Sequence, residues 1–85
     1  MKQSSIFTQA VTTGWVALAA HRGEQVSVLN GTGAVLQVRY ASQTAAGREI
    51  TLADGQSVGL NLCATSGEVQ IKAAAGAAGV HVVVR

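Results

Sequence analysis

The sequence predicts a small all-β protein, built as a β-sandwich or jelly-roll-like barrel of seven to eight short antiparallel strands. Two observations lead to this prediction. Apolar and polar residues alternate with period two in most of the short runs, and turn residues such as Asn-Gly and Asp-Gly separate the runs about every eight to twelve positions. A length of 85 residues fits one domain spanning residues 1–85, with residues 1–13 as an extended N-terminal strand or arm.

The N-terminal part predicts one strand and one ambiguous segment. Ser4–Thr13 is rich in β-forming residues and predicts the first strand. Trp15–Ala20 fits either a strand or a helix of about two turns, capped by Thr13 and stopped by Gly23. We favour the strand, which sets Trp15 on the face opposite Leu18.

A hairpin is expected between residues 25 and 41. Gln25–Asn30 alternates with its valines inward, the turn Asn30-Gly31-Thr32-Gly33 follows, and Val35–Ala41 alternates again. An Asn-Gly pair at the head of a turn favours a tight connection between paired strands. Ser42–Gly47 is then a polar loop of ordinary length.

Arg48–Leu62 gives the clearest pattern in the chain, two alternating runs around the turn Ala53-Asp54-Gly55. Gly55 can take a positive φ at no steric cost, so the Asp-Gly pair predicts a second hairpin. One face of this hairpin is expected to join the core, and its apolar residues are Ile50, Leu52, Val58, Leu60 and Leu62.

The C-terminal third predicts two more strands. Cys63–Gly67 is a turn, and Glu68–Lys72 is a strand with Val69 and Ile71 inward. The glycines of Ala73–Gly79 argue against a helix and predict a loop. Val80–Arg85 closes the chain as a strand with Val80, Val82 and Val84 on one face.

The composition favours association and argues against several classes of partner. Apolar residues make up 48% of the chain but only three are aromatic, so the core is built from small side chains. The six basic residues are scattered and the net charge is only +2, which predicts no nucleic-acid binding. No run is long enough to span a membrane, and polar residues such as Thr12 and Thr13 interrupt the apolar stretch that a secretory signal needs. With only 12% charged residues, the surface suits permanent contacts in a homo-oligomer, a dimer or a trimer.

The side chains that could carry chemistry do not gather in the sequence. Cys63 is expected to be a small buried hydrophobe, because a lone cysteine in a β domain more often packs than reacts. His21 and His81 lie sixty positions apart and lack the acidic or cysteine partners of a metal site. We therefore expect no catalytic residues, no metal and no cofactor, and we predict that the protein is not an enzyme.

Any interface should involve sheet edges and exposed apolar residues. Proline is absent, so nothing of that kind blocks an edge strand from pairing with another chain. His81 and Val83, on the outer face of the last strand, are the first candidates, although a neighbouring strand of the same chain could equally cover them. Trp15 is either a binding anchor or a filler of the core. The expected interface residues are Ile6, Phe7, Trp15, His81 and Val83.

The chain resembles the small β-rich virion proteins of tailed bacteriophages, most of all capsid decoration or cement proteins. The resemblance covers most of the chain and rests on Gly14–Ala19, Val26–Gly31, Ile50–Val58 and the closing valines. It implies a non-enzymatic protein of the virion, assembled in the host cytoplasm, that bridges subunits of the major capsid protein or other virion proteins and stabilises the shell. No catalytic residues carry over.

Two other functions stay open. The protein could belong to the head–tail connector, the tail or a fibre of the same kind of particle. It could also be a carbohydrate- or receptor-binding module that uses Trp15 and Tyr40 as stacking rings.

Overall fold

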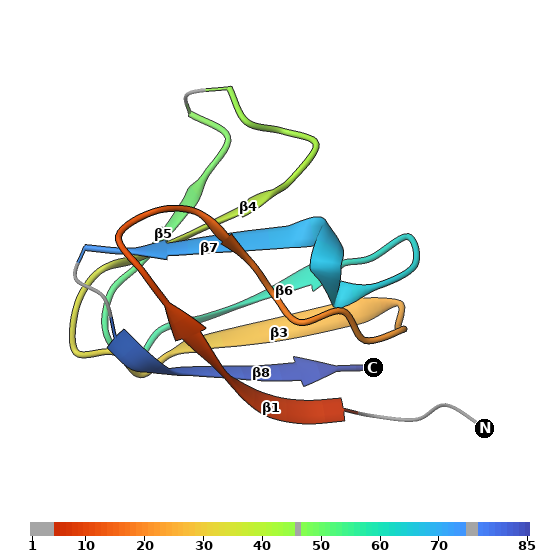
Figure 1. Cartoon of the computed structure of the whole chain (residues 1–85), viewed down its shortest axis with the longest axis horizontal. Coiled ribbons are helices and arrows are strands. Elements are labelled where there is room, and N and C mark those ends of the chain that lie inside the picture. Colours follow the sequence, from red (N-terminus) through yellow and green to blue (C-terminus); the bar gives the residue numbers. More distant parts are fainter. Residues whose placement is uncertain (1–4, 46, 75–76) are drawn as a thin grey trace.

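The computed structural model describes residues 5–45, 47–74 and 77–85, and it confirms the predicted all-β class. Two four-stranded antiparallel sheets face each other as a sandwich (Figure 1). Sheet A has the strand order β1-β8-β3-β6, and sheet B has the order β2-β7-β4-β5. The strands are β1 (Ser5–Val11), β2 (Val16–Ala17), β3 (Gln25–Asn30), β4 (Leu36–Tyr40), β5 (Ile50–Leu52), β6 (Ser57–Asn61), β7 (Val69–Ala73) and β8 (Ala77–Val84). None of the described residues forms a helix with the length and apolar character of a membrane span.

The core lies between the sheets and is filled mainly by valine. Inward positions alternate along most strands as the sequence predicts, because the side chains of a strand point to opposite faces in turn. The expectation that Ile50 joins the core is wrong, since this residue of the edge strand β5 is 40% exposed. The predicted inward faces of β3, β7 and the end of β8 are confirmed. The buried apolar residues are Val11, Leu18, Val26, Val28, Leu36, Val38, Leu52, Leu62, Val69, Ile71, Ala73, Val80, Val82 and Val84.

The predicted hairpin over Arg48–Leu62 is wrong, although its turn is right. Gly55 has φ +85°, and the N–H of Gln56 donates to the carbonyl of Ala53 at 3.0 Å, as in a tight β-turn. However, β5 pairs with β4 in sheet B and β6 pairs with β3 in sheet A. The turn carries the chain from one sheet to the other, so the two apolar faces meet across the core instead of side by side.

The predicted hairpin over residues 25–41 is wrong for the same reason. β3 lies in sheet A between β8 and β6, and β4 lies in sheet B between β7 and β5. The connection of residues 31–35 is thus a second arch between the sheets. Both strands of each arch still bury one face, since the alternating pattern fixes which side is inward and leaves the pairing partner open.

Buried Asn30 ties the two arches together. Its side-chain N–H groups donate to the carbonyls of Ala34 at 2.6 Å and Leu52 at 3.1 Å, and its side-chain oxygen accepts the N–H of Thr32 at 3.0 Å. Its backbone also accepts the N–H of Gly55 at 2.7 Å. One fully buried polar residue of sheet A therefore holds the ends of both crossings into sheet B.

Three further segments differ from expectation. The strand favoured for Trp15–Ala20 is present but only two residues long, as β2. The loop predicted for Ala73–Gly79 is wrong at its end, because β8 already begins at Ala77 and pairs there with Val11; residues 75 and 76 lie outside the described residues. The turn predicted for Cys63–Gly67 runs into a 3-10 turn, η1 (Ser66–Glu68). Ser4, the first residue of the predicted first strand, and Ala46, within the predicted loop Ser42–Gly47, also lie outside the described residues.

Candidate interaction surfaces

The outer face of sheet A brings together three of the five predicted interface residues. Ile6 of β1 lies directly opposite Val83 of β8, and His81 lies between Thr8 and Leu29 on the two neighbouring strands. Ile6 is 78% exposed and Leu29 39% exposed, so the described residues leave this face open to solvent. We call it the A face, defined by Ile6, Thr8, Ser27, Leu29, Ser57, Gly59, His81 and Val83.

Leu29 is a member of the A face that the sequence prediction missed. The signal was present, since Leu29 follows Val28 in an alternating strand and must point away from the core when Val28 points into it. Phe7 lies on the other side of β1. It is half-buried against the core, and its ring centroid is 4.6 Å from that of His21.

Trp15 belongs to the opposite surface of the molecule, the outer face of sheet B. The guanidinium of Arg39 lies 3.9 Å from the centre of its ring, and the ammonium of Lys72 lies 5.2 Å from it. The Arg39 side chain is oriented by a hydrogen bond from Nε to the side-chain oxygen of Gln70 at 2.9 Å. Trp15 is thus half-buried beneath two cations, and the alternative of a core residue is wrong.

The edge of sheet A at β6 presents backbone groups to solvent. The N–H of Leu62 donates to Glu24 at 2.8 Å and that of Asn30 donates to Gln56 at 2.9 Å, at the two ends of the β3–β6 ladder. In an antiparallel ladder the polar groups of successive residues point alternately toward and away from the partner. The backbone groups of Ser57, Gly59 and Asn61 therefore point away from β3.

The same reasoning applies to β1, at the other edge of sheet A. The N–H of Gly31 donates to Gly79 at 2.9 Å, so the odd-numbered residues of β8 bond to β3 and its even-numbered residues face β1. The partners of those even-numbered residues are Ser5, Phe7 and Gln9. Ile6 and Thr8 are left with their backbone N–H and C=O groups directed outward, where none of the described strands pairs with them.

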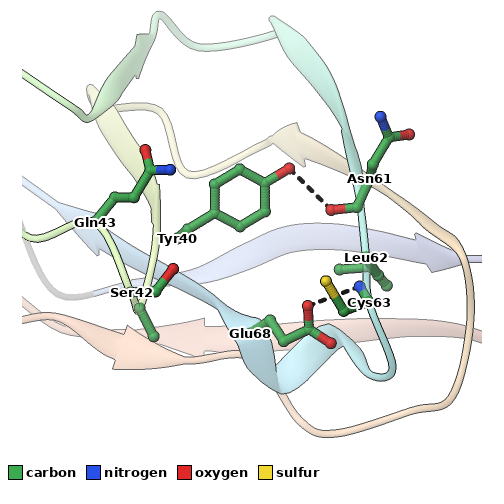
Figure 2. Close-up of a pocket in the computed structure, with 8 residues that line it drawn as sticks. Tyr40, Ser42, Gln43, Asn61, Leu62, Cys63 and Glu68 are labelled. Atoms are coloured by element: carbon green, nitrogen blue, oxygen red, sulfur yellow. Dashed lines mark hydrogen bonds between the residues drawn. The ribbon is translucent and has the colours of Figure 1, made fainter.

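A mostly apolar cavity of about 530 Å³ opens between the ends of β4 and β6 (Figure 2). The side chain of Tyr40 extends across it, and its hydroxyl donates to the carbonyl of Asn61 at 2.8 Å. Its lining consists of Tyr40, Ala41, Ser42, Gln43, Asn61, Leu62, Cys63 and Glu68.

The acidic group of this cavity is engaged in holding the chain. The Glu68 carboxylate accepts the backbone N–H groups of Cys63 at 2.8 Å, Ala64 at 2.5 Å and Thr65 at 2.8 Å. These bonds favour the charged form and lower the pKa of Glu68 below its ordinary value. Glu68 is therefore suited to cap the turn and poorly suited to accept a proton in catalysis.

The other titratable groups are dispersed. Cys63 is exposed, so the prediction of a buried cysteine is wrong. His21 packs on Phe7, His81 lies on the A face, and Cys63 lies at the cavity. Within the described ranges, no three His, Cys, Asp or Glu side chains come together in a way that could hold a metal ion.

Comparison with known proteins finds a likeness of fold. No protein-family model matches the chain, and no curated protein sequence matches it. A solved structure from the work described as "Bacillus endospore appendages form a novel family of disulfide-linked pili" is similar, with a TM-score of 0.57 and 20% sequence identity. The match covers 95% of this chain and 80% of that one. At this identity the likeness establishes a shared β fold.

Proposed function

We propose that this chain is a non-enzymatic structural subunit that assembles with copies of itself into rows through the two edges of sheet A. The observation that carries the proposal is the match between these edges. β1 leaves the backbone groups of Ile6 and Thr8 directed outward, and β6 does the same with those of Ser57 and Gly59.

The two edges are also complementary in direction. Because sheet A has four antiparallel strands, β1 runs opposite to β6. A second copy displaced sideways would set its β1 beside β6 in an antiparallel pair, without any rotation. This contact joins two different surfaces, so it repeats from copy to copy and generates a row.

The register within sheet A supports the same arrangement. Ile6 is opposite Val83, Val83 is opposite Ser27, and Ser27 is opposite Gly59. Pairing Gly59 with Ile6 of the next copy continues this line of residues, and Ser57 then meets Thr8. Both new pairs join residues whose backbone groups already point outward, which is the condition for a hydrogen-bonded ladder.

The likeness of fold to a subunit from disulfide-linked pili of Bacillus supports a repeating structural role. It does not extend to the covalent linkage. The chain has one cysteine, Cys63, which can join at most two copies by a disulfide. Cross-linking along a row would need two cysteines in each copy, so we expect the rows to be held by non-covalent strand pairing.

A second candidate is the one favoured by the sequence resemblance, a decoration protein on the capsid of a tailed bacteriophage. In that case the same edges would meet the capsid protein, and the location would be the virion. Electron microscopy of phage particles tests this candidate, because a decoration protein would be seen on the shell in hundreds of copies. A connector or tail component would instead be present in about a dozen copies or fewer.

Two proline variants test the row contact. Gly59→Pro removes an outward N–H from β6, and Thr8→Pro removes one from β1; neither residue donates to a neighbouring strand of its own sheet. Among the described residues, a Cβ at Gly59 would contact only the carbonyl oxygen of Val26, at 4.0 Å, so Gly59→Ala serves as the matched control. Ile6→Pro replaces Thr8→Pro if the latter fails to fold.

The expected result is specific to a contact between unlike edges. Each proline variant alone should sediment as a monomer, since one of its edges is blocked, whereas the wild type and Gly59→Ala form rows. An equimolar mixture of the two proline variants should form a dimer, because each supplies the edge that the other lacks. Folded variants that still form rows, or that stay monomeric when mixed, would refute the proposal.

A further inference from the structure

The A face differs from the rest of the surface in carrying no permanent charge. β1, β3, β6 and β8 contain no Asp, Glu, Lys or Arg, and His81 is their only titratable side chain. Small polar residues and the apolar side chains of Ile6, Leu29 and Val83 make up its remainder. Four adjacent strands without a charge form an unusual surface for a protein exposed to water on that side.

Resting on the rows proposed above, we infer that the A face packs against the A face of a second copy in another row, and that His81 makes this pairing sensitive to pH.

Charge identifies a second copy as the occupant. Identical surfaces bring identical charges together, so a self-contact is favoured only where like charges are absent. The outer face of sheet B carries Arg39 and Lys72 on adjacent strands and would repel its own copy. The A face introduces no such repulsion, and it offers no charged group with which a strongly acidic or basic partner could pair.

The area of the A face explains why rows pair and single subunits do not. Four strands of five to eight residues cover about 400 Å² in projection, well below the roughly 800 Å² that each partner contributes to a standard interface. In a row, edge pairing without rotation continues the A face from one copy to the next. The small contacts of many copies then act together, and their sum holds two rows.

His81 lies in the middle of the contact. Thr8 and Leu29 flank it on the neighbouring strands, and its ring lies against Gly31, where an added Cβ would be 3.2 Å from the imidazole Cδ2 and Nε2. None of the four strands supplies a carboxylate to face it. The nearest charged residues along β8 and β3 are Arg85 and Glu24, at the far end of both strands. In the arch next to Gly31, the carboxylate of Asp54 accepts the N–H of Gly33 at 2.9 Å.

The sign of the pH effect follows from this setting. Face-to-face sheets lie about 10 Å apart, which excludes water from the central side chains. A protonated imidazole would be enclosed between two sheets whose strands supply no carboxylate, so the paired state favours neutral His81. Pairing is then strongest near pH 8 and weakens toward pH 5, the range in which histidine gains its charge.

Four proteins test the inference, with the mass per unit length of the rows measured by scanning transmission electron microscopy at pH 8 and pH 5. Leu29→Lys adds a charge to the A face, and Thr51→Lys adds the same charge to exposed Thr51 on sheet B. His81→Gln removes the titratable group. Wild type and Thr51→Lys should lose half of their mass per length between pH 8 and pH 5, Leu29→Lys should show the lower value at both, and His81→Gln the higher value at both.

Each contrary outcome has a defined meaning. Single rows of wild type at pH 8, or double rows of Leu29→Lys, would overturn the pairing and leave the rows themselves intact. Double rows of wild type at pH 5, or separation of His81→Gln rows at pH 5, would overturn the role of His81. Folded wild-type protein that forms no rows at either pH would instead refute the proposed function.

Discussion

The two outer faces of the sandwich differ in chemistry although they cover the same core. The A face is uncharged and shows Ile6 and Leu29 to solvent, whereas the outer face of sheet B holds Trp15 beneath Arg39 and Lys72. On sheet B the large apolar ring is already covered by side chains of its own molecule. On sheet A no side chain of the described residues covers Ile6 and Leu29 in this way. This difference supports the proposal that sheet A, and not sheet B, meets another molecule.

The largest loss of stability is expected when the hydrogen bonds that join the two sheets at Asn30 are removed. Asn30→Ala leaves the buried carbonyl of Leu52 and the N–H of Thr32 without the partners that Asn30 provides. We expect a loss of about 3 kcal/mol in the free energy of unfolding, measured by urea denaturation. Exposed Asn61→Ala is the control, and its loss should stay within about 0.5 kcal/mol. Equal losses in the two variants would contradict the role given to Asn30.

A second prediction sharpens the distinction between the inner and outer faces of one strand. Val82 is fully buried and Val83 lies on the A face. Val82→Ala should lower the free energy of unfolding by about 2 kcal/mol through lost burial and a cavity, and Val83→Ala by less than about 0.5 kcal/mol. If the A face is an interface, Val83→Ala should instead weaken assembly. If Val82→Ala and Val83→Ala lost equal stability and equal assembly, the distinction between an inner core face and an outer interface face would be contradicted.

Acid stability separates folding from association. The pKa of Glu68 is lowered in the folded protein by three backbone N–H groups. Its contribution to stability is therefore complete above the ordinary glutamate pKa and is lost as the pH falls through the lower pKa of the folded state. Glu68→Gln should be less stable than wild type near pH 7 and should lose less stability on going to pH 2, as followed by thermal unfolding. If the unfolding temperature of the subunit fell between pH 8 and pH 5 together with the pairing of rows, folding and association would not be separate in their pH dependence.

The smallest effect is expected on sheet B. Arg39→Gln removes the guanidinium from the Trp15 ring but keeps a polar side chain beside Gln70. A cation–π contact at the protein surface contributes about 0.5–1 kcal/mol, so the change in unfolding free energy should be of that size, with assembly unaffected. Trp15 fluorescence reports the change directly. If Arg39→Gln lost the ability to assemble, the interface would lie on the outer face of sheet B, contrary to the proposal.

The faces of the strands could be predicted from the sequence, but their partners could not. Period-two alternation placed Val26, Val28 and the closing valines inward and His81 and Val83 outward. That Ile6 lies on the same surface as Val83 depends on the pairing of β1 with β8. The Asp54-Gly55 and Asn30-Gly31 turns have the same local chemistry in an arch as in a hairpin. What decides between them is burial of both faces across the core, together with the hydrogen bonds of Asn30, and both depend on strands far away in the sequence.

The position of Trp15 was the other point that local pattern left open. Its outward direction is fixed by Val16, which pairs with buried Ile71, and Trp15 is then carried to the side of Lys72. That pairing joins segments more than fifty residues apart. The cavity at Tyr40 and the cap at Glu68 likewise depend on contacts between separate strands and turns.

The two arches also have a kinetic consequence. Strands that follow each other through either arch do not pair, so neither can zip together as a local hairpin, and every ladder of sheet A must close a long loop first. Chains with such connectivity fold slowly for their size, typically in milliseconds to seconds. A newly made chain would thus expose β1 and β6 before β8 and β3 have joined them into one sheet. The two edges would take the direction and register needed to pair with a neighbour only when the whole sandwich has formed. Completion of the monomer would then time its own polymerisation.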